Sequence, residues 1–156
     1  MTISADPGGT PYPTTLVATA LASRTRPAWG WWALRLSLTV QAVDAFLQPV
    51  FEGRFLSGDF AMLATHRTNG TYVGVVSVSQ VVLAIVAWWV SRVPMKVVLT
   101  IVALGATAGL QIYLGFHRDL GLHIPLGVAL IGVSGWLAVW MWTHRPPRTD
   151  DSGVRS

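Results

Sequence analysis

Cysteine is absent from all 156 residues of the chain. The protein therefore has no disulfide, thiolate nucleophile, iron–sulfur cluster or cysteine zinc site. Charge is also scarce, at 12% of residues against roughly 25% in a typical soluble domain. Together with 52% hydrophobic residues and a mean hydropathy of +0.50, this composition excludes an ordinary soluble domain and a disordered chain.

Lysine and arginine exceed aspartate and glutamate by 11 to 7, and the pI is about 10.4. A nucleic-acid-binding protein gathers such charge into one patch or stripe. Here the basic residues fall between long apolar runs instead. The sequence therefore predicts a membrane protein whose partner is the lipid bilayer, and no nucleic-acid partner.

Four segments are long enough to cross a bilayer, which takes about 20 mostly apolar residues. They lie at about 32–51, 71–90, 97–116 and 120–142. A four-transmembrane-helix domain over residues 29–143 is therefore expected, with flexible tails at 1–28 and 144–156. The predicted fold class is an all-α integral membrane four-helix bundle.

The distribution of cations predicts the orientation of this bundle. With both termini in the cytoplasm, eight cations lie on the inner side and three on the outer side, which agrees with the positive-inside rule. The inner ones are Arg24, Arg26, Arg35, Arg92, Lys96, Arg145, Arg148 and Arg155. The tryptophans gather toward the same side, where indole rings favour the headgroup region. We expect a multi-pass protein of the inner (plasma) membrane with both termini in the cytoplasm.

The second half of the chain repeats the first. The repeated positions are Gln48 and Gln111, His66 and His123, Gly70 and Gly127, and Ser77 and Ser134. Offsets of 4 and 11 residues from each histidine stay on one face of a helix. The pattern predicts two helical hairpins related by a pseudo-twofold axis along the membrane normal.

The two histidines form the predicted site. The second and fourth helices run in the same direction, so His66 and His123 lie at similar depth near the outer surface. Two facing imidazoles are the ligand set of a six-coordinate haem. The alternative is a pair of interfacial histidines, hydrogen-bonded to the other hairpin or to water.

Further residues complete this predicted haem site. Gly70 and Gly127 would leave room for the porphyrin. The haem propionates would pair with three arginines, Arg54, Arg67 and Arg118. The imidazoles would be oriented by Gln48 and Gln111. The two glutamines are equally compatible with plain hydrogen bonding between helices.

Two other polar residues have open roles. Asp44 lies near the middle of the first helix, where an acid is a candidate for proton movement. Equally, it is a protonated carboxyl bonded across the bundle to Thr100 or Thr107. His117 precedes His123 by six residues and is either a spare ligand or a loop residue.

The segments LQPVFEGRFLSGDFAMLATHRTNG and LQIYLGFHRDLGLHIPLG resemble one four-helix half of the haem A synthase family, over about residues 36–142. The resemblance implies a histidine pair on the second and fourth helices, here His66 and His123, suited to haem. The family has two such halves and this chain has one. The family's acidic residue shortly before the first of these histidines has no match in residues 61–65. The resemblance thus implies a small b-type cytochrome-like module rather than the oxidising enzyme.

These observations predict an integral membrane protein that binds haem b and transfers electrons or senses redox state. It would be at most a redox subunit, within a larger membrane or respiratory complex or as a homodimer. The alternatives are a haem-free accessory subunit of a membrane complex and a small proton-coupled transporter that uses Asp44. A visible absorption spectrum separates the haem protein from both.

Overall fold

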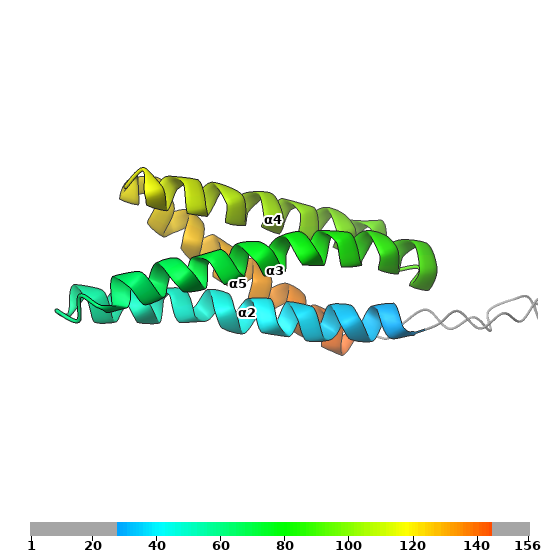
Figure 1. The fold of residues 1–156 in the computed structure, drawn as a ribbon. Coiled ribbons are helices and arrows are strands. Elements are labelled where there is room, and N and C mark those ends of the chain that lie inside the picture. Colours follow the sequence, from blue (N-terminus) through cyan, green and yellow to red (C-terminus); the bar gives the residue numbers. More distant parts are fainter. Residues whose placement is uncertain (1–27, 145–156) are drawn as a thin grey trace, which may run out of the picture. The chain divides into compact units, whose positions relative to one another are not determined.

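A computed structural model describes residues 28–144. The described chain forms four helices in sequence, α2 (Trp29–Leu56), α3 (Met62–Ser91), α4 (Met95–Phe116) and α5 (Leu120–Thr143), which confirms the predicted all-α bundle (Figure 1). Nearly all of both predicted tails lie outside the described residues. So do five cations used for the orientation, namely Arg24, Arg26, Arg145, Arg148 and Arg155.

Three of the helices, α3, α4 and α5, are long and apolar enough to cross a membrane. The remaining helix, α2, has the length for a span, at 28 residues. Its Arg35, Asp44, Glu52 and Arg54 lower its hydropathy, so composition alone does not mark it as a span. Since α2 packs against both α3 and α5, it is nevertheless part of the same bundle.

The helix bounds differ from the expected spans mainly around the first turn. Helix α2 continues to Leu56, and α3 already begins at Met62 rather than near residue 71. The polar segment that opens α3 keeps its backbone hydrogen bonds inside the helix, so its polar side chains do not prevent helix formation. In the second hairpin the bounds agree closely with the prediction, because Pro94 precedes α4 and the Asp119 side chain caps α5 by accepting from Leu122 N at 3.3 Å.

The helices form two antiparallel hairpins, α2–α3 and α4–α5, which also contact each other through α3 with α4 and α2 with α5. Figure 1 shows the hairpins apart at the end that holds the turns 57–61 and 117–119. We call this the histidine end, and the opposite end, with Trp29, the 92–94 turn and Thr143, the tryptophan end. Large apolar side chains cover much of the outer surface, as expected of a surface that faces lipid.

Polar contacts join α2 to α3 along the interior of the first hairpin. Asn69 donates to Asp44 O at 3.0 Å, Gln41 donates to Ser77 Oγ at 2.9 Å, and Gln80 donates to Ser37 O at 2.7 Å. Apolar burial gives little drive for association within lipid, so packing and hydrogen bonds such as these hold membrane helices together. The first hairpin is therefore fixed by specific side-chain contacts.

Arg35 joins the two hairpins at the tryptophan end. Its side chain is buried, and it donates to Met141 O at 2.8 Å and to His144 O at 2.6 Å. These carbonyls lie at the negative end of the α5 dipole, where a cation is stabilising. The Trp32 and Trp142 rings flank the guanidinium at 4.8 and 5.6 Å. The bundle is thus clamped at this end, while the hairpins separate toward the other.

Candidate functional site

A cavity of about 450 Å³ opens at the histidine end, between the two hairpins. Its wall contains most of the predicted site residues, namely Gln48, His66, Arg67, Gly70, Gln111, Arg118, His123 and Gly127. Val73 and Leu130 also line it, while Ser77 and Ser134 lie fully buried further along the same two helices. The predicted shared faces of α3 and α5, from each histidine to its serine, are therefore confirmed.

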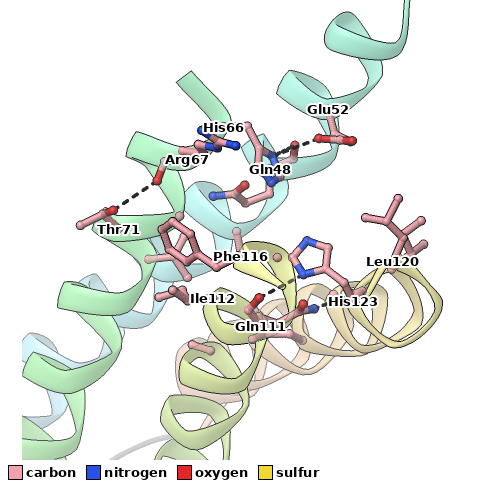
Figure 2. A pocket seen from close by; sticks show the side chains of 18 of the residues that line it. Gln48, Glu52, His66, Arg67, Thr71, Gln111, Ile112, Phe116, Leu120 and His123 are labelled. Atoms are coloured by element: carbon pink, nitrogen blue, oxygen red, sulfur yellow. Dashed lines mark hydrogen bonds and ion pairs between the residues drawn. The ribbon is translucent and has the colours of Figure 1, made fainter. Parts of the chain in front are cut away.

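The two imidazoles face each other across this cavity (Figure 2). Their ring centroids are 6.3 Å apart, and the ring planes are inclined by 65°. His66 comes from the second turn of α3 and His123 from the first turn of α5. Because both helices start at the histidine end, the two rings reach the same depth, as the repeat predicts.

Each imidazole is held by a backbone carbonyl of its own hairpin. Nδ1 of His66 lies 3.2 Å from Gln48 O, and Nδ1 of His123 lies 3.0 Å from Gln111 O. A carbonyl can only accept, so Nδ1 carries the proton in both contacts. This tautomer leaves the lone pair of Nε2 free in both rings, which is the form that binds a metal. The glutamine positions were predicted to orient the imidazoles, and their main chains make these contacts.

Gly127 makes room for the Gln111 side chain, whereas Gly70 lies at ordinary contact distance from the Gln48 side chain. A Cβ at residue 70 would lie 3.4 Å from Gln48 Nε2, and a Cβ at residue 127 would lie 2.8 Å from Gln111 Nε2. The sequence suggested instead that these glycines would admit a porphyrin. In the structure the glutamine amides lie beside both glycines, because Gln48 on α2 points toward α3 and Gln111 on α4 points toward α5.

The glutamine amides add polar atoms to a mostly apolar cavity. Gln111 Nε2 donates to His123 O at 2.9 Å. Gln48 Nε2 and Gln111 Oε1 are buried without a protein partner. Buried polar groups normally find a partner in a ligand or an ordered water when protein supplies none. These two amide atoms are therefore unsatisfied polar atoms beneath the cavity wall.

Two predicted candidates lie away from the cavity. Arg54 forms an exposed ion pair with Asp59, Nη2 to Oδ2 at 2.7 Å, and does not line the cavity wall. His117 stacks on Tyr113 with ring centroids 4.0 Å apart and lies in the exposed turn before α5. The structure therefore favours the loop role for His117 over the spare-ligand role.

Asp44 lies half-buried on α2, and Asn69 from α3 contacts its main-chain carbonyl. The expected hydrogen bond from Thr100 or Thr107 does not form. The Thr100 hydroxyl donates to Lys96 O at 2.8 Å, and the Thr107 hydroxyl donates to Ala103 O at 2.8 Å. A threonine has one hydroxyl proton, and in a helix the carbonyl one turn earlier is the nearest acceptor.

Glu52 is a wall residue that the sequence did not single out. Its carboxylate Oε2 lies 3.7 Å from Nδ1 of His66. The predicted first span stops at residue 51, so the continuation of α2 beyond it places this side chain in the cavity. The spacing of four residues from Gln48 would have indicated the shared helix face.

Within residues 28–144, no group of three or more His, Cys, Asp or Glu side chains is placed to hold a bare metal ion. Haem iron requires fewer protein ligands, because the porphyrin supplies the remaining ones. No family model, curated protein or solved structure matches this chain.

Proposed function

We propose that the protein binds one haem b in this cavity through His66 and His123, and that it serves in electron transfer or redox sensing. The observation that carries the proposal is the facing histidine pair with ring centroids 6.3 Å apart. Haem b supplies one-electron redox chemistry when bound. The protein would supply both axial ligands, the apolar surroundings and the countercharges.

The separation of the rings fits ligation of one iron. Two nitrogen–metal bonds of about 2 Å each, with about 1.2 Å from each nitrogen to its ring centroid, give a span of about 6.4 Å. The observed centroid distance of 6.3 Å agrees with this span. Each ring can rotate about the line that would join its nitrogen to the iron without changing the nitrogen–iron distance. The observed 65° angle between the ring planes is therefore also compatible with ligation of one iron.

The protonation of the rings supports the same proposal. Both Nδ1 atoms are engaged by carbonyls, at 3.2 and 3.0 Å, which leaves Nε2 as the available donor atom on each ring. A pair of interfacial histidines that only bonded to water would have no need of matched backbone acceptors on both sides. The repeat of this contact in both hairpins favours ligation over a solvent-facing role.

The wall of the cavity suits a flat, mostly apolar molecule with an anionic edge. Its volume of about 450 Å³ lies within the roughly 300–1,000 Å³ of ligand sites. Apolar side chains such as Phe116, Ile124 and Ile131 form much of the wall, while Arg67 and Arg118 supply cations. Guanidinium groups bind carboxylates in a two-pronged geometry, so these arginines are the candidates for the propionates.

Ligation of the iron by both His66 and His123 would favour electron transfer over chemistry on a bound substrate. With both imidazoles committed as ligands, neither is free for acid–base work. With both termini in the cytoplasm, as the positive-inside rule predicts, the histidine end would lie at the outer face of the inner membrane. Electrons would then be exchanged with a partner at the outer surface, in a larger membrane or respiratory complex or within a homodimer.

The absorption spectrum of protein purified from haem-supplied cells tests this proposal. The wild type should carry one low-spin haem, and His66→Ala and His123→Ala should each lose the low-spin spectrum. His117→Ala is the matched control, because His117 lies outside the cavity wall, and it should retain the wild-type spectrum. A colourless wild type would contradict the proposal and leave a haem-free accessory subunit or a transporter.

A further inference from the structure

The two halves of the site differ in one respect that the repeat makes visible. Aligning Gln48 with Gln111 places Glu52 opposite Gly115. Glu52 Oε2 lies 3.7 Å from Nδ1 of His66. At Gly115, an added Cβ would lie 3.2 Å from Cε1 of His123, so the second ring packs directly against the backbone. One imidazole therefore has a carboxylate beside it, and the other has none at the equivalent place.

We infer that Glu52 makes His66 the more strongly donating of the two imidazoles and so stabilises the oxidised form of the bound haem. The inference rests on the proposed function and goes further, since it assigns a positioning role to Glu52. The proton on Nδ1 of His66 is donated to Gln48 O at 3.2 Å, and the Glu52 carboxylate lies beside the same nitrogen at 3.7 Å, too far for a hydrogen bond. Its negative charge favours positive charge on the ring and so strengthens electron donation from Nε2 to a bound iron.

Few other basic side chains lie close enough to Glu52 to neutralise its negative charge. Within residues 28–144, no basic side chain other than His66 lies within 4.0 Å of the Glu52 carboxylate. Arg67 and Arg118 line the same cavity and His123 faces it from α5, so these are the other charged or titratable groups nearby. The Glu52 side chain is 35% exposed, which places its charge at the cavity wall beside a poorly solvated ring rather than in bulk water.

A more strongly electron-donating imidazole favours ferric over ferrous iron, because its donated electron density stabilises the more positively charged Fe³⁺ more than Fe²⁺. Loss of an outer partner of a metal-bound histidine changes metal affinity by about 10–100-fold. We expect Glu52→Gln to lower the affinity for ferric haem relative to ferrous haem by about tenfold. For a one-electron couple this is an increase of about 59 mV in the midpoint potential.

The test is an equilibrium redox titration of haem-loaded wild type, Glu52→Gln and Asp119→Asn, followed by the visible spectrum. Asp119→Asn is the control. It removes one negative charge at the same end of the bundle, and asparagine retains the ability to cap α5. Glu52→Gln should raise the potential clearly, and Asp119→Asn should change it far less. Equal potentials in Glu52→Gln and wild type, or equal shifts in both variants, would overturn the inference and leave haem binding intact.

Two other outcomes are also decisive. A wild type that takes up no haem overturns the proposed function and this inference together. If Glu52→Gln is helical but loses haem, Glu52→Asp decides the matter, because it keeps the carboxylate. Retention of haem in Glu52→Asp would support a role of the charge, and loss in both variants would refute it.

Discussion

Replacing Gly127 by alanine tests the packing of the second half of the site without any assumption about a ligand. The new Cβ would lie 2.8 Å from Nε2 of Gln111, which is closer than real side chains approach. The Gln111 amide must move, and this breaks its 2.9 Å hydrogen bond to His123 O. The loss of this partly buried hydrogen bond, which leaves polar groups unpaired, costs about 1–3 kcal/mol, whereas glycine to alanine within a helix gains about 1 kcal/mol.

Gly132→Ala provides the matched control on the same helix, because nothing lies within 4 Å of a Cβ at that position. It should gain about 1 kcal/mol from helix propensity alone. Gly127→Ala should therefore be less stable than Gly132→Ala by about 1–3 kcal/mol. The free energies of unfolding can be measured by circular dichroism during titration of the micellar protein with sodium dodecyl sulfate.

A double-mutant cycle shows whether Gln111 causes the difference. In a Gln111→Ala background the side chain that Gly127→Ala would displace is absent. There, Gly127→Ala should stabilise the protein as much as Gly132→Ala does. If Gly127→Ala has the same effect in both backgrounds, the glycine does not serve to admit the glutamine amide, and this account of the cavity is incorrect.

Three further predictions concern the rest of the bundle. Arg35→Ala should destabilise the protein by about 3 kcal/mol in the same unfolding assay, because it removes two charged hydrogen bonds to the end of α5; a loss below 1 kcal/mol would contradict the clamp. Asp44→Asn should leave proton flux into proteoliposomes unchanged, and a loss of flux on this substitution would favour the transporter. In the cysteine-free chain, Ser57→Cys should react with an impermeant maleimide from outside intact cells and Arg92→Cys should not; the reverse result would invert the expected orientation.

The sequence predicted the bundle because its strongest signals are long and local. Apolar runs of about 20 residues indicate spans whatever their partners are, and the expected spans at 97–116 and 120–142 match α4 and α5 within two residues at each end. The first turn was located less well. Residues near His66 are polar, and hydropathy does not show that they already belong to α3.

The site was predictable to the extent that the repeat expresses it. Matching His66 with His123 and Gln48 with Gln111 placed all four residues in one cavity, as the structure has them. The backbone contacts to Nδ1 left no trace in the sequence, because any residue type supplies a carbonyl. The sequence suggested that Arg54 pairs with a propionate, whereas in the structure it pairs with Asp59. This ion pair depends on the geometry of the turn after α2, which the spacing of residues in the sequence does not specify.

The electron paramagnetic resonance spectrum of the oxidised wild-type protein, together with its haem content per chain, shows whether His66 and His123 hold a haem iron. The facing imidazoles, with ring centroids 6.3 Å apart, predict one haem per chain and a low-spin ferric signal, since two imidazole nitrogens would hold the iron. A high-spin signal would show that one histidine is not a ligand. Protein without haem after purification from haem-supplied cells would contradict the account as a whole.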